Sequence, residues 1–209
     1  MRILREYLSA KVKPTVIVVP SSKELNEIVH NEIERLGNDT DLNHIDTSKV
    51  TSMQFTFYRT DFNGDVSKWN VENVTDFTFM FAANEKFDGY LGDWNMHSAI
   101  LLDSMFNGAT NFTGDGLEKW KDKLGNCKQF KYTFQNCKHL VGKQFENWIL
   151  SKDLENVECM FQYCTELDCD LSKWTLKRGT QYHHMLYCCN KMSIFHYPKY
   201  AKGRNQSID

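Results

Sequence analysis

The five tryptophans of the chain recur at nearly constant spacing, and this regularity constrains the fold more than any other feature. They stand at positions 69, 94, 120, 148 and 174, so the intervals are 25, 26, 28 and 26 residues. A second column keeps step with them: Phe57, Phe81, Phe106, Phe134, Phe161 and then Leu186. Two sets of residues that recur along a chain with the same spacing indicate internal repeats, as found in solenoid proteins.

Each repeat is expected to contain one short helical segment and one short strand. Apolar residues lie seven and four positions before the phenylalanine, as at Val74 and Phe77, and this spacing is typical of a helix with one buried stripe. Turn-forming residues follow, and the repeat closes on a tryptophan and an apolar residue two positions later, as at Trp94 and Met96, which predicts a short parallel strand.

A unit of this size cannot bury its apolar face alone, so neighbouring units must cover it. We therefore expect an α/β fold, a right-handed leucine-rich-repeat-like solenoid of about five to six coils of roughly 25 residues over residues 41–192. Residues 1–40 are expected to cap it with a strand at 16–19 and a helix that opens on a capping box at 21–24 and stops at Gly37. The apolar face of that helix is predicted to hold Leu25, Ile28, Val29, Ile33 and Leu36. Residues 41–45 copy residues 65–69, which indicates a half repeat, and residues 193–209 are expected to form a C-terminal cap and a polar tail.

One repeat carries a recognisable family pattern. Val-Thr-Asp-x-x-x-Met-Phe at residues 74–81, followed by Phe-Asp-Gly-x-Leu-x-x-Trp at residues 87–94, resembles the BspA-type leucine-rich repeats of bacterial surface proteins. The resemblance covers residues 41 to about 192. It implies a repeat protein that acts by binding or adhesion rather than by catalysis. The third and fourth units are longer than the others, so local bulges are expected.

Composition places the chain in a polar, non-membrane class. The formal net charge is −2, and no apolar run approaches the length needed to cross a bilayer. Seven cysteines, an odd number, together with no visible secretory signal favour reduced thiols and a cytoplasmic location. Residues 61–120 hold ten acidic side chains against three basic ones, whereas residues 175–209 hold six basic against one acidic. Nucleic-acid contact is therefore expected only through the basic C-terminal region.

The candidate chemical groups have simpler explanations in the repeat. His183, His184, Cys188 and Cys189 are zinc-ligand types, but Cys189 occupies a repeat position shared with Cys164, Cys137, Ala109, Asn84 and Thr60, which indicates a slot for small buried side chains. Acids such as Asp65 lack the dense spacing of calcium loops. We expect no metal, no cofactor, no small-molecule substrate and no catalytic residue.

The remaining expectation is a binding surface beside the tryptophans. Its predicted members are Lys68, Asn70, Asp93, Asn95, Lys119, Lys121, Asn147, Ile149, Lys173 and Thr175. We expect a non-enzymatic protein–protein interaction module. The alternative is a stoichiometric inhibitor, encoded by a phage or mobile element, that blocks a host enzyme or a nucleic-acid-handling defence complex.

Overall fold

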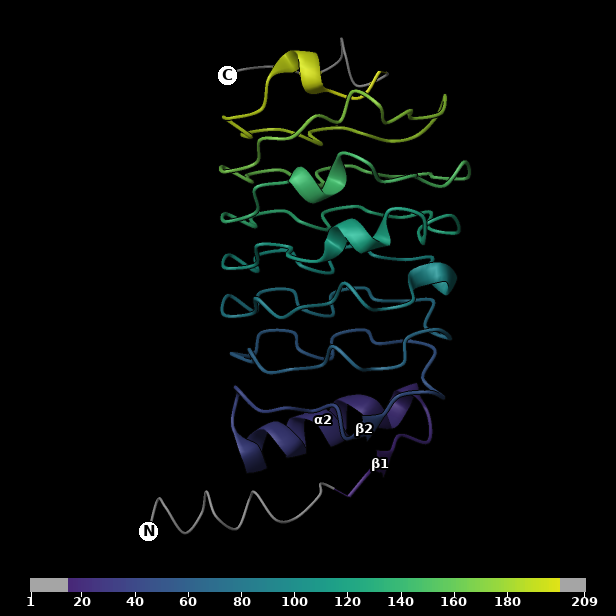
Figure 1. Cartoon of the computed structure of the whole chain (residues 1–209), viewed down its shortest axis with the longest axis vertical. Helices are drawn as coiled ribbons and strands as arrows, with labels where there is room; N and C mark the ends of the chain where they lie inside the picture. Colours follow the sequence, from purple (N-terminus) through teal and green to yellow (C-terminus); the bar gives the residue numbers. More distant parts are fainter. Residues whose placement is uncertain (1–14, 200–209) are drawn as a thin grey trace.

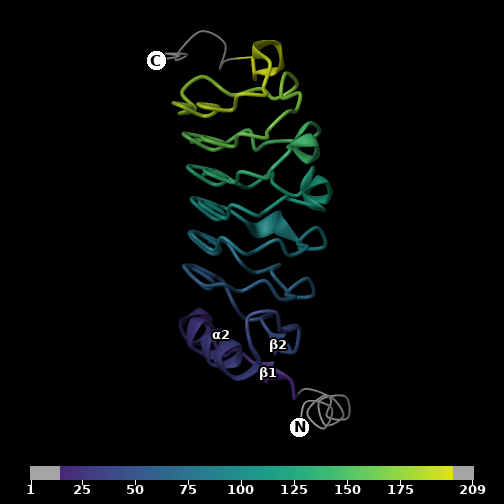
Figure 2. The same cartoon turned by 90° about the vertical axis from the view of Figure 1, so that its left-hand side faces the viewer.

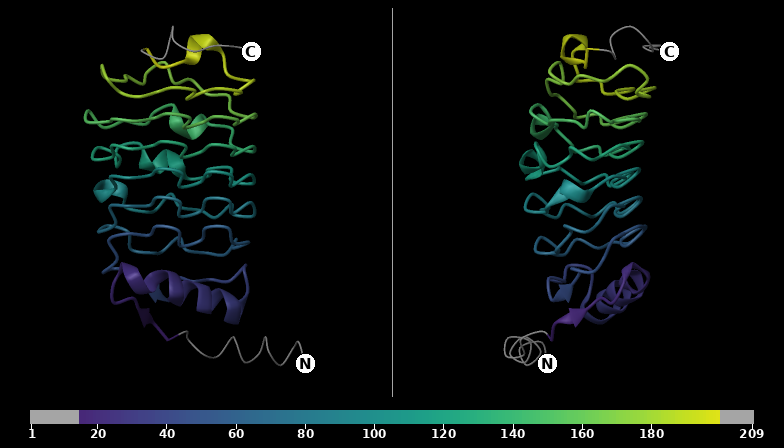
Figure 3. Two further views of the ribbon diagram at one scale, coloured as in Figure 1. Left: turned by 180° about the vertical axis from the view of Figure 1, so that it is seen from behind. Right: turned by 90° about the vertical axis from the view of Figure 1, so that its right-hand side faces the viewer.

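The chain is arranged in layers that follow one another along the long axis of the molecule (Figure 1). The computed structural model describes residues 15–199, and most of them lie in turns and irregular segments. Figures 2 and 3 show the same layering from the side and from behind. Within residues 15–199, no helix is long and apolar enough to cross a membrane.

A strand and a helix precede the layers, as the sequence predicts. Strand β1 (Ile17–Val18) pairs in parallel with β2 (Ile45–Asp46), and α2 (Ser22–Leu36) lies between them in the chain. The Ser21 side chain accepts a hydrogen bond from the Lys23 N–H, and Gly37 ends the helix at φ 98°. Helix α2 lies beneath the first layer, so it closes that end of the core (Figure 1). The predicted apolar face is buried at Leu25 and Val29. Leu36, in the last turn, is 44% exposed, so the prediction was wrong for Leu36.

Successive repeats are joined by one ladder of backbone hydrogen bonds, which we call the turn ladder. Its segments are residues 53–59, 77–83, 102–108, 130–136, 157–163 and 182–188. Alternate N–H groups of one segment donate to carbonyls of the next repeat: Met53 N–H to Asp76 C=O at 2.8 Å and Phe57 N–H to Met80 C=O at 2.8 Å, for example. Parallel bridges mark the start of the ladder, running Ser52, Asp76, Leu101, Gln129, Asn156 and Gln181.

The turn ladder replaces the helical segment expected from the sequence, and that prediction was wrong. The N–H groups between the ladder donors close tight turns instead, as when Tyr58 N–H donates to Phe55 C=O at 3.2 Å. Two residues in each segment take a left-handed backbone conformation, such as Phe79 at φ 57° and Ala83 at φ 53°. A left-handed residue ends a run of α-helix, so apolar residues three and four apart here reflect successive turns.

The phenylalanine column forms the centre of the core. Phe57, Phe81, Phe106, Phe134 and Phe161 are fully buried, and neighbouring rings lie 5.0–5.5 Å apart with interplanar angles of 2–7°. Parallel rings at this separation gain both burial and stacking. The periodic burial that the sequence predicts for this column is confirmed.

The tryptophan column is also buried, and each indole bonds to a preceding repeat. In each case the indole Nε1–H donates a hydrogen bond to a backbone carbonyl. The pairs are Trp69 and Leu42 (3.0 Å), Trp94 and Val66 (3.1 Å), Trp120 and Leu91 (3.0 Å), Trp148 and Leu117 (2.9 Å), and Trp174 and Phe145 (2.9 Å). A buried indole N–H requires such a partner. The column therefore links repeats by polar contacts as well as by packing.

The prediction of a short strand after each tryptophan was wrong. Within residues 15–199, β1 and β2 are the named strands, and the tryptophan side carries short 3₁₀ helices instead: η1 (Met96–Ser98), η2 (Leu117–Trp120) and η3 (Lys143–Phe145). A further one, η4 (Ile194–His196), follows the last repeat. Helices η2 and η3 begin after left-handed Gly116 and Gly142, so they coincide with the longer units where bulges were expected. The polar tail from residue 200 onward lies outside the described residues.

Candidate interaction surface

The residues predicted to bind a partner form two rows of exposed side chains beside the buried tryptophans. One row precedes the tryptophan in each repeat and the other follows it; together they comprise Lys68, Asn70, Asp93, Asn95, Lys119, Lys121, Asn147, Ile149, Lys173 and Thr175, all of which are exposed. Because the intervening tryptophans are buried and hydrogen-bonded, they hold the rows on a fixed base. We call these ten residues the tryptophan-side surface.

Polar contacts join some members of neighbouring repeats. Lys119 Nζ lies 2.8 Å from Asp93 Oδ1, and Lys119 also lies over the Tyr90 ring at 5.3 Å. The hydrogen bond to Asp93 raises the pKa of Lys119, and the same contact lowers the pKa of Asp93. Lys173 Nζ donates to Asn147 Oδ1 at 3.4 Å. Lys119 is therefore neutralised by a carboxylate, whereas Lys173 contacts a neutral amide.

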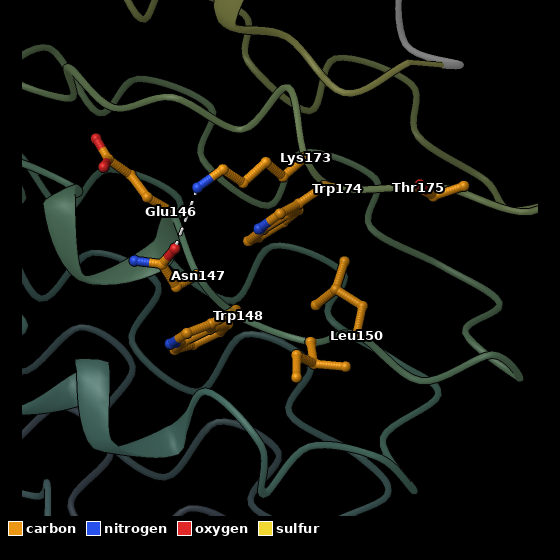
Figure 4. A pocket seen from close by; sticks show the side chains of 8 residues that line it. Glu146, Asn147, Trp148, Leu150, Lys173, Trp174 and Thr175 are labelled. Atoms are coloured by element: carbon orange, nitrogen blue, oxygen red, sulfur yellow. Dashed lines mark hydrogen bonds between the residues drawn. The ribbon is translucent and has the colours of Figure 1, made fainter.

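A pocket of about 350 Å³ opens on the C-terminal part of this surface (Figure 4). Residues 146–150 and 173–175 line it, and four of the predicted residues are among them: Asn147, Ile149, Lys173 and Thr175. The indoles of Trp148 and Trp174 stack at 6.4 Å with an interplanar angle of 9° and form an aromatic wall. The sequence places these residues on one surface but gives no sign of the pocket.

The two sides of the pocket differ in how their charges are balanced. The Glu146 carboxylate accepts the Asp170 N–H at 3.1 Å and lies 3.5 Å from Lys143 Nζ. Lys173 and Lys121 have no carboxylate within 4.0 Å among residues 15–199. Lys173 at the pocket and Lys121 in the preceding repeat therefore have no carboxylate partner among the described residues, whereas the Glu146 carboxylate at the pocket is compensated.

A group of partly exposed aromatic side chains at the start of the turn ladder was not predicted from the sequence. Phe55 and Phe79 stack at 5.2 Å with an interplanar angle of 6°, and Tyr58 packs edge-on against both. Phe55 is 44% exposed although its backbone is left-handed at φ 60°. An aromatic residue two positions before three of the core phenylalanines (Phe55, Phe79 and Tyr132) was the available signal, but the helical interpretation obscured it.

Six of the seven cysteines behave as buried core residues; Cys188 is partly exposed. Sγ of Cys137, Cys164 and Cys189 donates to Phe106, Phe134 and Phe161 carbonyls at 3.1, 2.9 and 2.9 Å. Burial raises the pKa of Cys189 to about 12 and disfavours its thiolate. At its three cysteines, the small-residue slot predicted from the sequence thus bonds a repeat to the one before it.

The zinc-type residues near the C-terminal end do not converge. The rings of His183 and His184 meet edge to face at 4.6 Å, and Cys189 is turned into the core. Across residues 15–199, no three His, Cys, Asp or Glu side chains are grouped so that they could hold a metal ion.

Comparison with known proteins gives a family but no activity. The model of a family described as "Mycoplasma protein of unknown function, DUF285" matches residues 23–148 and, in an overlapping second match, residues 123–196. The chain belongs to this family. Two matches of one family model to one DUF285 chain agree with the internal repeats seen in sequence and structure. No curated protein and no solved structure showed significant similarity to it.

Proposed function

We propose that this DUF285 chain is a right-handed solenoid of the leucine-rich-repeat kind, related to BspA-type repeats, and that it acts as a non-enzymatic protein-binding module. Stacked repeats with a shared core support the solenoid because each unit covers the apolar face of its neighbour. The buried phenylalanine and tryptophan columns have this arrangement. The BspA relationship rests on the Met-Phe and tryptophan motifs at residues 80–81 and 94.

The observation that carries the proposed function is the tryptophan-side surface. Its side chains are exposed in register on a base of buried indoles, so binding a partner would require little ordering of the backbone. Ile149 is 65% exposed at the edge of a pocket, where an isolated solenoid gains nothing from an apolar side chain. Raised thiol pKa values also favour binding over thiol catalysis, because a buried neutral thiol is a poor nucleophile.

Site-specific photo-crosslinking tests this proposal. A benzophenone amino acid is placed at Ile149 and, as a matched control, at Lys138, an exposed residue of the same repeat outside the tryptophan-side surface. In cells of the native host, we expect a discrete protein adduct from position 149 and none from position 138. Equal labelling from both positions, or no adduct from position 149, would contradict the proposal.

A further inference from the structure

The pocket between Trp148 and Trp174 has the shape and lining for one apolar side chain of a partner. Ile149 and Leu150 line it beside the stacked indoles of Trp148 and Trp174, which are only 4% and 2% exposed. At the position after the tryptophan, the other repeats carry Asn70, Asn95, Lys121 and Thr175, so Ile149 is the apolar member of its row. A concave apolar wall edged by polar groups is typical of a site that anchors a side chain.

One lysine without a carboxylate partner in the described part of the chain lines the pocket, and a second lies in the repeat before it. Lys121 precedes Ile149 in the row, and the two residues are joined by a hydrogen bond from the Ile149 N–H to the Lys121 C=O at 2.7 Å. Lys173 lines the pocket itself and contacts the Asn147 amide. Because neither cation has a carboxylate partner in the described part of the chain, a bound carboxylate would gain charge-assisted hydrogen bonds without displacing an existing ion pair.

Few direct backbone hydrogen bonds join neighbouring repeats beside the tryptophans; within residues 15–199, none joins Asn70 to Asn95 or Asn95 to Lys121. Ile149 is bonded to the repeat before it, but within residues 15–199 no backbone hydrogen bond joins Ile149 to Thr175 of the repeat after it. The pocket lies between these two segments.

We propose that this pocket binds an extended acidic segment of another protein, with an apolar side chain in the pocket and flanking carboxylates on Lys121 and Lys173. This inference rests on the proposed function and specifies the partner's chemistry. We choose an acidic segment because its charge complements that of the two lysines, which would repel a basic segment. The apolar side chains at the pocket argue against a ligand that is held by phosphate contacts alone.

Selection from a library of random short peptides tests the inference. We expect the wild-type chain to enrich peptides with an apolar residue beside Asp or Glu, and to bind them at least about tenfold more tightly than versions with Lys in place of the acids. The I149S variant should lose about tenfold in affinity, since it removes the apolar contact. The double variant K121E/K173E should lose the acidic preference. K138E in the same repeat is the matched charge control and should bind as the wild type does.

The outcomes separate this inference from the proposed function. Enrichment without acidic residues, no enrichment, or tighter binding of a single-stranded oligonucleotide than of the selected peptides would overturn the acidic-segment assignment. An adduct at Ile149 together with any of these results would leave the binding function standing. All substituted residues are exposed, so an unchanged melting temperature is expected and verifies that lost binding does not come from unfolding.

Discussion

Nε2 of His44 lies 2.8 Å from Oε2 of Glu32, and this contact ties helix α2 to the first half repeat. Glu32 is almost fully buried, and Arg35 donates to it from the next turn of the helix at 2.6 Å. A buried carboxylate is tolerated when several donors satisfy it. The N-terminal cap is therefore held by a polar contact in addition to the apolar contacts of Leu25 and Val29.

The first prediction concerns the pH dependence of this contact. The hydrogen bond from Arg35 lowers the pKa of Glu32 below its usual value of 4.5, with a smaller contribution from His44. A carboxylate whose pKa is lower in the folded chain stabilises it above the unfolded pKa, and this contribution is lost as the pH falls below 4.5 toward the folded pKa. We expect E32Q to lower the free energy of unfolding by about 1 kcal/mol at pH 7 and by less at pH 3.5. Urea unfolding at both pH values measures this, and E34Q on the exposed face of α2 should have no effect at either.

The second prediction separates burial of the indole from its hydrogen bond. Trp94 is 1% exposed and donates to Val66 C=O. We expect W94F to cost about 1–2 kcal/mol, because the carbonyl loses its partner, and W94A to cost about 3–5 kcal/mol, because a large cavity forms. Chemical denaturation gives both values. If the two variants had equal stability, the hydrogen bond rather than the packing would account for the whole effect.

The third prediction uses adjacent alanines in the turn ladder. Ala83 is exposed with φ 53°, and the corresponding residue of the next repeat is Gly108 at φ 76°. We expect A83G to raise the free energy of unfolding by about 1 kcal/mol, because glycine adopts left-handed backbone at little cost. Ala82 does not have a positive φ and is buried, so A82G should destabilise the chain instead. Thermal unfolding of both variants checks the opposite signs, and destabilisation by A83G would argue against the left-handed assignment.

The fourth prediction concerns thiol reactivity. Cys188 is partly exposed, whereas Cys127, Cys137, Cys159, Cys164, Cys169 and Cys189 are buried. Burial raises the pKa of each of these six thiols. We expect one fast phase of reaction with a chromogenic disulfide in the native state, which C188S abolishes, and reaction of all thiols in urea. A fast phase that survives in C188S would show that the core opens more readily than its packing indicates.

The sequence was most informative where burial repeats. Trp94 and Phe81 could be assigned to the core because like residues recur at matching positions, and Ser21 and Gly37 could be assigned to helix ends because their chemistry suits caps. The turn ladder could not be predicted: its left-handed positions carry residues such as Phe79 and Cys159, which have no special preference for that backbone. Apolar spacing of three and four residues is shared by a helix and by successive turns, so it favoured the wrong element.

The candidate site was predicted in part for a related reason. Asn147 and Lys173 each directly precede a buried tryptophan, and this position was enough to predict that their side chains are exposed. The pocket depends on how two segments of neighbouring repeats, 146–150 and 173–175, lie together, and no single repeat encodes that arrangement. Whether the surface binds a protein stays a prediction.

The indole hydrogen bonds have an evolutionary consequence. Trp94 and Trp120 each reach back to a carbonyl earlier in the chain, and neither bond depends on how many units follow. A duplicated unit would bring its own donor and find an acceptor already in place. A repeat could therefore be added or removed while the hydrogen bonds of the remaining indoles stay in place.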